Sequence, residues 1–133
     1  MDSVFTKIIN QQLPAFRLWE NGLFIAILDI HPINPGYTLL IPKQQIDYIF
    51  DLPDELYNSM WQVVKWLAPL IQQAMECKRI GIAVEGFSVP HVHIHLVPVN
   101  SGNELNPERA VAASPEQLTI IQNKICQAIN NSL

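Results

Sequence analysis

The sequence predicts an α+β fold in which a mostly antiparallel sheet of about five short strands carries helices on one face. Short apolar segments bounded by turn residues lie between residues 16 and 41 and again after residue 79. Helical spacing of apolar residues is confined to two long stretches, about 54–76 and 114–131. Ten prolines are spread along the chain without a linker between them, so residues 1–133 are expected to form a single domain.

Three short strands are expected in the N-terminal third of the chain, each bounded by turn residues. They cover residues 16–20, 23–29 and 37–41. Asn21-Gly22 is a strong two-residue hairpin signal, which pairs the first two strands antiparallel. A short helix over residues 4–10 precedes these strands, and a loop at residues 31–36 (HPINPG) leads into the third.

A long helix is predicted over about residues 54–76, because apolar residues recur there at helical spacing. Asp51 or Asp54 can cap its start. Pro69 lies inside it and is expected to kink or split the helix, because proline cannot donate the helical hydrogen bond. Two further strands are expected after this helix, at residues 79–85 and 91–97.

The C-terminal part of the chain predicts one more helix, over about residues 114–131. Ser114 fits its N-cap, Pro115 fits its first helical position, and Gln117 completes a capping box. Apolar residues three or four apart then form one stripe along it, namely Leu118, Ile121, Ile125 and Ile129. This stripe indicates a helix that packs one side against the core.

Composition and charge exclude several classes of function. Hydrophobic residues make up 49% of the chain and charged residues 15%, which favours a compact core with apolar surface left for a partner. The net charge is −4 without any cluster of Lys or Arg, so a nucleic-acid polymer is not an expected partner. No segment approaches the ~20 apolar residues of a membrane span, and no signal peptide is visible. Cys77 and Cys126 form no CxxC pair and suit a reducing compartment, so we expect a cytoplasmic protein.

Three of the four histidines lie within six residues, HVHIHL at residues 91–96. Side chains alternate along a strand, so His91, His93 and His95 are expected to project from one face. Because neighbouring positive charges disfavour one another, at least one ring is expected to be neutral and available as a nucleophile or ligand. Two other interpretations stay open, a metal site built on histidines at i and i+2 and a polar strand that faces solvent.

Three segments carry a further pattern: FTKIINQQLP at residues 5–14, LDIHPINPGYTLLIPK at residues 28–43 and PHVHIHLV at residues 90–97. In this order they resemble the motifs of the histidine triad (HIT) superfamily of nucleotide hydrolases and transferases. The last segment matches the family pattern His-φ-His-φ-His-φ-φ, where φ is apolar. The resemblance covers about residues 3–100 and implies the HIT fold and a homodimer in which the long helix and a strand of each chain meet across a twofold axis.

The resemblance implies a role for each histidine of the triad. His93 would attack the α-phosphorus of a nucleoside phosphoramidate, dinucleotide or similar ester, and water would then cleave the covalent nucleotidyl-histidine. His91 would orient this nucleophile through its backbone carbonyl, and His95 would hydrogen-bond a phosphate oxygen. Ser88 stands at the family's Ser/Thr position, whose hydroxyl and N–H contact the phosphate or the bridging atom.

The same resemblance implies a nucleotide site. Asp29 would accept hydrogen bonds from the ribose hydroxyls, while Ser88 and His95 contact the phosphate. His31 and Ile30 are next to Asp29 in the sequence and are candidates for the wall of the base pocket. Structural alternatives stay open: Asp29 can simply end its strand, Ser88 can be a plain loop hydroxyl, and His31 can be a surface residue.

The chain departs from the family at its common zinc site, which uses two cysteines near the start, a histidine after Pro-Lys and the first triad histidine. Ser3, Thr6 and Gln45 stand at three of these positions, so only His91 remains. Three histidines of one flat strand also span about 13 Å, which makes convergence on one ion awkward. We therefore expect neither a metal nor any other cofactor.

Two more departures concern the ligand. Tyr37 stands where a histidine often follows Pro-Gly in the family, and Val84 stands where an asparagine often contacts the ligand. The loop before the triad, residues 85–90, is shorter than the family's Gly-rich stretch. These changes keep two rival interpretations open: a nucleotide-binding module with little turnover, and a metal-dependent hydrolase that uses the histidine strand.

Overall fold

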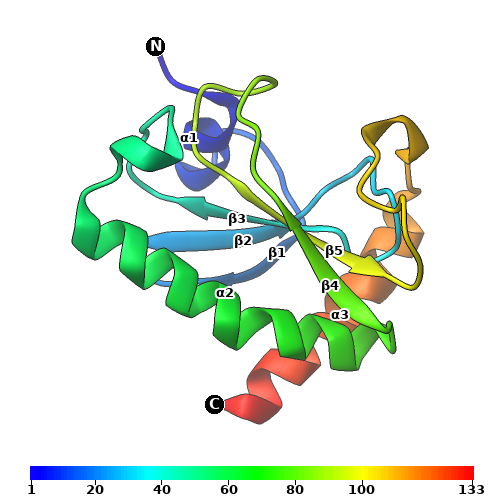
Figure 1. The fold of residues 1–133 in the computed structure, drawn as a ribbon. Coiled ribbons are helices and arrows are strands. Elements are labelled where there is room, and N and C mark those ends of the chain that lie inside the picture. The colour runs from blue at the N-terminus through cyan, green and yellow to red at the C-terminus, as the bar shows by residue number, and fades with distance from the viewer.

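The computed structural model describes all residues 1–133 and contains one five-stranded sheet, three α-helices and two short 3-10 helices. The strand order is β1-β2-β3-β5-β4, and every neighbouring pair is antiparallel (Figure 1). The predicted α+β class is therefore confirmed. In chain order the elements are α1 (Val4–Ile9), β1 (Arg17–Glu20), β2 (Phe24–Leu28), β3 (Thr38–Pro42), η1 (Ile49–Asp51), α2 (Asp54–Met75), β4 (Arg79–Ala83), β5 (Ile94–Val99), η2 (Pro107–Arg109) and α3 (Pro115–Ser132).

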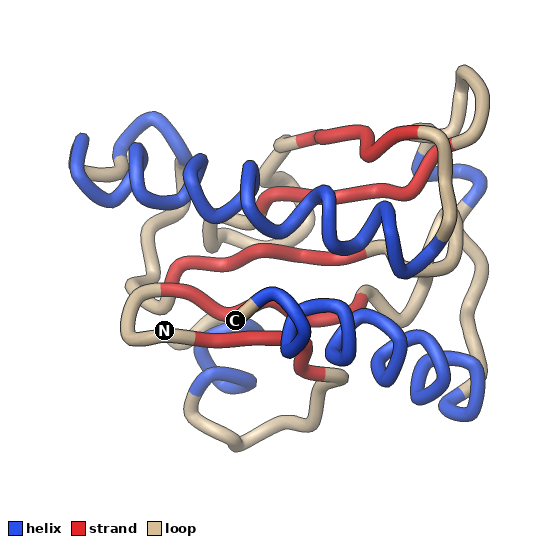
Figure 2. Tube along the Cα trace, turned by 90° about the horizontal axis from the view of Figure 1, so that it is seen from below, coloured by secondary structure: helices blue, strands red, loops and turns tan.

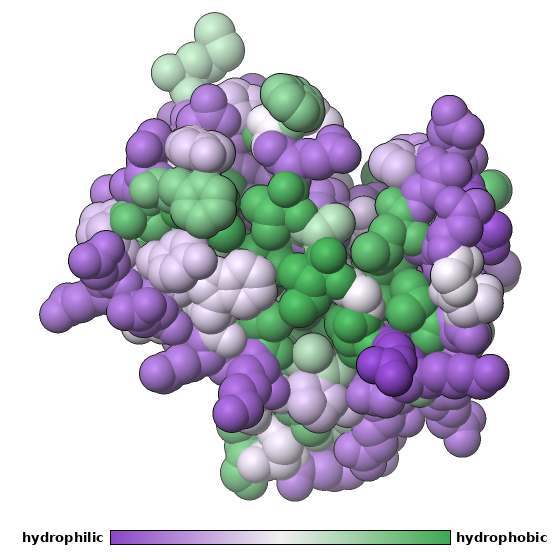
Figure 3. Space-filling model, viewed as in Figure 1, coloured by the Kyte–Doolittle hydropathy of each residue, from purple (hydrophilic) through white to green (hydrophobic).

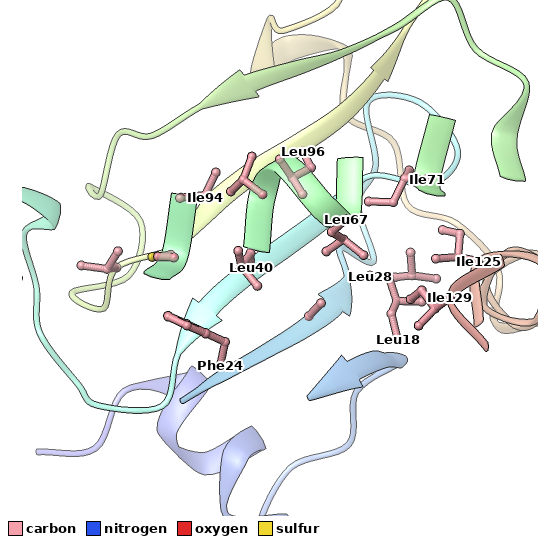
Figure 4. Close-up of a cluster of buried hydrophobic side chains, with 14 of the residues drawn as sticks. Leu18, Phe24, Leu28, Leu40, Leu67, Ile71, Ile94, Leu96, Ile125 and Ile129 are labelled. Atoms are coloured by element: carbon pink, nitrogen blue, oxygen red, sulfur yellow. The ribbon is translucent and has the colours of Figure 1, made fainter. Parts of the chain in front are cut away.

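The two faces of the sheet are covered differently. Helices α2 and α3 lie across the same face (Figure 2), and the side chains between these helices and the sheet form the larger core (Figure 4). Its fully buried members include Leu40, Leu67, Ile94, Leu96 and Ile125. No helix is both long enough and apolar enough to span a membrane.

Helix α1 packs on the opposite face of the sheet, so the expectation that all helices share one face is wrong (Figure 1). Phe5 and Ile8 are three residues apart on this helix and are both buried against that second face. They join a smaller cluster with alternate residues of β2 and β3, namely Ile25, Ile27, Leu39 and Ile41. This second layer places α1 beside the triad.

Helix α2 runs unbroken from Asp54 to Met75, although it contains Pro69. Pro69 is exposed, so water can solvate the carbonyl one turn before it that loses its helical hydrogen bond. Of the two expected effects of Pro69, a kink or a split, the split is therefore wrong. The expected cap is wrong too, because Pro53 is the N-cap and no side chain caps the helix. The capping box predicted for α3 at Ser114 and Gln117 is confirmed.

The β1–β2 hairpin turns one residue later than expected. The N–H of Asn21 donates to the carbonyl of Phe24 at 3.0 Å, so Gly22 and Leu23 are the central residues. The side-chain oxygen of Asn21 accepts hydrogen bonds from the N–H groups of Leu23 and Phe24 at 2.9 and 2.8 Å. Asn21 is therefore the first residue of the turn, which its side chain stabilises, and not one of the two central residues.

Candidate active site

The histidine segment enters the sheet only near its end. Strand β5 begins at Ile94, so the strand predicted over residues 91–97 is wrong for its first three residues. Val92 donates its N–H to the carbonyl of Ile46, in the loop after β3, at 2.8 Å. This bond ties the segment to a loop instead of to the strand ladder. His95 lies within the ladder, between β3 and β4.

All three histidines nevertheless lie on the side of the sheet that α1 covers, because the residues alternating with them belong to the core under α2 and α3. The ring centroids of His93 and His95 are 4.8 Å apart. The ring of Phe5, on α1, lies edge-on at 5.8 Å from His91 and 5.0 Å from His93. The common face expected from the alternation is confirmed.

His93 is held in one orientation by the backbone of the residue two before it. Its Nδ1 lies 2.7 Å from the carbonyl oxygen of His91, and only 3% of the residue is exposed. A carbonyl can only accept, so Nδ1 of His93 carries the hydrogen. In the neutral ring Nε2 then keeps a free lone pair, which is the form of imidazole that acts as a nucleophile.

His91 is fully buried, and both of its ring nitrogens are hydrogen-bonded inside the protein. Nε2 lies 2.7 Å from the carbonyl oxygen of Pro42, and Nδ1 lies 2.6 Å from the hydroxyl oxygen of Ser3. Burial lowers the pKa of His91, so we assign a neutral ring that donates from Nε2 and accepts the Ser3 hydroxyl hydrogen at Nδ1. This ring is a structural support for its own carbonyl and has no free nitrogen for a ligand.

The residues at the family's zinc positions form a hydrogen-bonded cluster that ties α1 to His91. Gln45 Oε1 accepts from the N–H of Ser3 at 2.9 Å and from the hydroxyl of Thr6 at 2.6 Å. Gln45 Nε2 donates to the carbonyl of Met1 at 2.9 Å. One imidazole, two hydroxyls and an amide are a poor donor set for zinc, which prefers thiolate, imidazole and carboxylate ligands. These residues do not fit the metal.

His95 differs from the other two histidines in being half-buried and in its partner. Its Nδ1 lies 2.6 Å from the hydroxyl oxygen of Tyr37. Burial, followed by the neighbouring His93, lowers the pKa of His95 to about 4, so the ring is neutral at physiological pH. The sequence marked Tyr37 only as a departure from the family, and its contact with His95 was missed because 58 residues separate the pair.

Asp29 directly follows β2 and is held by backbone contacts on both sides. Its N–H donates to the carbonyl of Tyr37 at 2.9 Å, and its Oδ1 accepts from the N–H of His31 at 2.8 Å. Burial raises the pKa of Asp29. The carboxylate thus shapes the turn after β2, and it also lines the two cavities beside the triad.

The two largest cavities beside the triad share part of their lining. The smaller, of about 470 Å³, is lined by apolar residues of α1 and β2, and the larger, of about 600 Å³, is lined by the loop before the triad and by residues 105–110. Neither cavity is lined by Lys or Arg. The predicted residues that line both cavities are Asp29, His31, Ser88 and His95, and those that line only the smaller of the two are Ile30 and His93.

Of the predicted site residues, therefore, only His91 lines neither cavity. The sequence missed Phe5, Ile8 and Leu13, which form much of the apolar wall of the smaller cavity. Their helical spacing identifies a packing face, but it does not show that this face borders a cavity. Leu105, in the larger cavity, lies in a stretch where the sequence carries no motif.

The sequence profile of the HIT domain matches residues 10–102. An uncharacterized HIT-like protein of Borreliella burgdorferi is 30% identical, over 80% of this chain and 88% of its own. The adenosine 5'-monophosphoramidase HNT1 of Saccharomyces cerevisiae is 34% identical, over 71% of this chain and 61% of its own.

Solved structures agree with these matches. A HIT-like protein of Bartonella henselae superposes with a TM-score of 0.84 at 27% identity, over 96% of both chains. A zinc-bound histidine triad protein of Mycobacterium smegmatis superposes with a TM-score of 0.78 at 27% identity, over 100% of this chain and 99% of that one. The profile spans well over half of the sequence and includes the whole triad. The chain belongs to the HIT family.

Proposed function

We propose that this protein is a nucleotide hydrolase that cleaves the bond between the α-phosphate and its leaving group, a phosphorus–nitrogen or phosphorus–oxygen bond. The observation that carries this proposal is the state of His93, whose Nδ1–H is engaged by the carbonyl of His91 while Nε2 keeps its lone pair. The side chain also borders a cavity large enough for a nucleoside. The yeast relative named as an adenosine 5'-monophosphoramidase supports a phosphoramidate substrate.

In the first step Nε2 of His93 attacks the α-phosphorus, and the bond to the leaving group breaks. The leaving group departs with that electron pair and takes up a proton from water. The positive charge that develops on the imidazole is stabilised by the hydrogen bond from Nδ1–H to the carbonyl of His91. Water then attacks the phosphorus and releases one proton to the solvent, which balances the proton taken up by the leaving group. The bond from phosphorus to His93 breaks, its electron pair returns to Nε2, and the nucleoside monophosphate leaves the neutral ring.

The nucleotide would lie with its base in the smaller cavity, whose wall includes Phe5, Ile8 and Ile27. Asp29 would accept hydrogen bonds from the ribose hydroxyls at the junction of the two cavities. Ser88, in the loop before the triad, and His95 would contact the phosphate, because both line the two cavities. His31 and Ile30 would flank the ribose and the base, respectively.

A second candidate is a nucleotide-binding module with little turnover. The observation that favours it is the loop before the triad, in which Ser88 is exposed and its hydroxyl makes no hydrogen bond. Such a hydroxyl is not held in place for a phosphate before binding. This candidate predicts nucleotide binding of ordinary strength, with no AMP formed from a phosphoramidate.

The test is incubation with adenosine 5'-phosphoramidate, followed by denaturation at alkaline pH, where a phosphorus–nitrogen bond survives. We expect free AMP in solution and, early in the reaction, AMP attached to the peptide that contains His93. The His93→Ala variant is the control and should show neither. Binding without AMP favours the module, and turnover that persists in His93→Ala contradicts the covalent mechanism.

We also propose that the protein acts as a homodimer. Strand β4 is at the open edge of the sheet, and Ile82 on it is 41% exposed. Figure 3 shows apolar side chains gathered over the middle of the face that α2 and β4 present, with polar side chains around them. The indole N–H of Trp61, on α2, is buried without an acceptor in the single chain.

A reducing compartment such as the cytoplasm suits the two unpaired cysteines, Cys77 and Cys126.

A further inference from the structure

Tyr37 is a buried tyrosine whose hydroxyl reaches the third histidine of the triad. The two groups meet at 2.6 Å between the hydroxyl oxygen and Nδ1 of His95. Their rings are nearly perpendicular, at 83°, with centroids 5.6 Å apart. Only 9% of Tyr37 is exposed, because its ring is part of the smaller core cluster. The short contact is therefore made from a well-packed ring.

The backbone around Tyr37 is fixed as well. Its N–H donates to the carbonyl of Asn34 at 3.2 Å, and its carbonyl accepts from the N–H of Asp29 at 2.9 Å. The preceding residue, Gly36, has a φ of +90°, and a Cβ there would lie 2.6 Å from Cγ of Met75. Glycine at position 36 therefore lets the loop before Tyr37 pack closely against the end of α2. This packing helps to fix the position of the tyrosine ring.

The direction of the hydrogen bond follows from the protonation of its two partners. Burial, together with the nearby carboxylates of Asp29 and Glu85, raises the pKa of Tyr37 to about 12, so the hydroxyl keeps its hydrogen. His95 is neutral, since its pKa is lowered to about 4, and a neutral imidazole has one N–H and one lone pair. The hydroxyl makes no other hydrogen bond within the protein, so Nδ1 of His95 is the one acceptor that the protein offers its hydrogen.

We propose that Tyr37 is a positioning residue, whose hydroxyl donates to Nδ1 of His95 and so holds the hydrogen of that ring on Nε2. Nε2–H is then a fixed donor for a phosphate oxygen, and the ring does not exchange between two tautomers. The catalytic consequence rests on the proposed function, in which His95 contacts the phosphate. Tyr37 acts only through His95, and the tautomer itself does not depend on any activity.

The test compares the wild type with Tyr37→Phe, which removes the hydroxyl and keeps the ring, and with Tyr48→Phe as the matched control. Tyr48 is 55% exposed and makes no hydrogen bond through its hydroxyl. Nitrogen-15 NMR of the histidine rings, without substrate, should show the wild-type His95 with its hydrogen on Nε2. In Tyr37→Phe we expect mixed tautomers and a kcat about threefold to tenfold lower, with KM changed less than twofold.

Tyr48→Phe should leave both the His95 spectrum and kcat unchanged. A wild-type His95 that carries its hydrogen on Nδ1, or a spectrum that is the same in Tyr37→Phe, overturns the proposal, and so does a Tyr37→Phe kcat within twofold of the wild type. If the wild type shows no hydrolase activity, the proposed function fails, while the NMR spectra still decide whether Tyr37 sets the tautomer.

Discussion

The three histidines are the same side chain placed in three different environments. His91 is buried between Ser3 and Pro42, and neither of its ring nitrogens is free. His93 has one nitrogen engaged by a carbonyl and one free, and His95 faces a tyrosine hydroxyl. The roles proposed for the three rings, as support, nucleophile and donor, therefore rest on the groups that each ring contacts and not on the motif alone.

Replacing the central histidine tests the nucleophile. We expect His93→Ala to lower kcat/KM about 10³-fold or more, because no other side chain can form the covalent intermediate. Binding of AMP should survive, since Asp29 and the apolar wall of the smaller cavity remain. The measurement is initial-rate kinetics on adenosine 5'-phosphoramidate, with AMP titration as the control for folding. A variant that keeps more than a tenth of the wild-type rate would show that the mechanism is wrong.

The proposed role of Asp29 is to bind the ribose hydroxyls of the nucleotide, so its replacement should weaken nucleotide binding. Asp29→Ala is expected to weaken AMP binding by about 1.5–3 kcal/mol, the range for hydrogen bonds to a charged group. Asp29→Asn is the matched control, because its amide oxygen can still accept from the N–H of His31. Titration calorimetry should show little loss for 2',3'-dideoxy-AMP in either variant. An equal loss for both ligands would mean that Asp29 only shapes its turn.

The sequence was informative about the face that the three histidines share and much less about the partners that fix their rings. Period-two spacing placed the histidines on one face, and this was confirmed. The partners that fix the rings of His91 and His95, Ser3 and Tyr37, are 88 and 58 residues away in the sequence. Contacts at such separations depend on the topology of the sheet and on where α1 packs, which local periodicity does not encode.

At the scale of the elements, hydrogen bonds from Ser3 and Thr6 attach α1 to His91, the first histidine of the triad. The four side chains already converge, since Ser3 and Thr6 lie 2.6 and 3.5 Å from Nδ1 of His91 and Gln45 contacts Thr6 at 2.6 Å. The side chains at all four zinc positions of the family therefore lie close together, but hydroxyl and amide groups are poor ligands for zinc.

Metal removal should therefore leave the wild type active. We expect unchanged activity in EDTA and well under one zinc per chain by elemental analysis. The triple variant Ser3→Cys, Thr6→Cys, Gln45→His is the positive control, because with His91 it completes a Cys₂His₂ set. It should bind about one zinc per chain and melt more than about 5 °C higher with zinc than after EDTA. Tightly held zinc in the wild type, lost together with activity, would contradict the proposed mechanism.

Element boundaries departed from prediction where a tertiary contact overrides the local pattern. The segment before Ile94 has a strand pattern, yet its N–H groups bond to loops, so no ladder forms there. Pro69 has the local character of a helix breaker, yet α2 continues through it because packing of one face on the sheet holds the helix together. The central strands β2 and β3 were predictable because each is a short, mostly apolar run bounded by turn residues, and every residue in both is buried.

Glu104 fixes the loop after β5 and gives the fold a pH dependence. Its carboxylate accepts from the N–H groups of Asn100 and Ser101 at 2.6 and 2.7 Å and from the side-chain amide of Asn34 at 2.9 Å. These bonds lower the pKa of Glu104 from 4.5 to about 2. Since the folded state holds the proton less tightly, this contribution is fully present above about pH 4.5 and is lost as the pH falls toward 2.

Glu104→Gln should therefore lower the urea midpoint at pH 7, because an amide has one acceptor oxygen where the carboxylate has two. The difference from the wild type should shrink between pH 5 and pH 3, as the wild-type protein begins to lose its own contribution. Glu108→Gln is the matched control, since Glu108 is exposed and its carboxylate has no partner. A midpoint difference that is the same at pH 3 and pH 7 would contradict this role for Glu104.

At the scale of the whole molecule, the sheet separates the main hydrophobic core from the candidate active site. The face under α2 and α3 holds the larger core, and the face beside α1 holds the triad and its cavities. Each triad histidine is therefore next in sequence to a residue of the larger core. The packing of these core residues fixes the position of the backbone that carries the imidazole rings. Loops from both ends of the sequence then close around the cavities.

The two edges of the sheet differ in a way that predicts how two chains meet. The β1 edge is covered by α3, whose Gln122 Nε2 donates to the carbonyl of Arg17 at 2.9 Å and whose Cys126 contacts the carbonyls of Arg17 and Leu18. The β4 edge has no such cover. An open strand edge with exposed apolar side chains favours pairing with another chain, so we expect the twofold interface at β4 and α2.

Sedimentation of the wild type at tens of micromolar should then give about twice the chain mass of 15.1 kDa. Ile82→Asp places a charge at the β4 edge, where burial in an interface would leave it unpaired, and it should shift the equilibrium to monomer. Ile120→Asp is the matched control, because Ile120 is 58% exposed on α3, away from that edge, and the same substitution there should leave the dimer intact. A wild type that sediments as a monomer, or an Ile120→Asp variant that dissociates as readily as Ile82→Asp, would place the interface elsewhere or remove it.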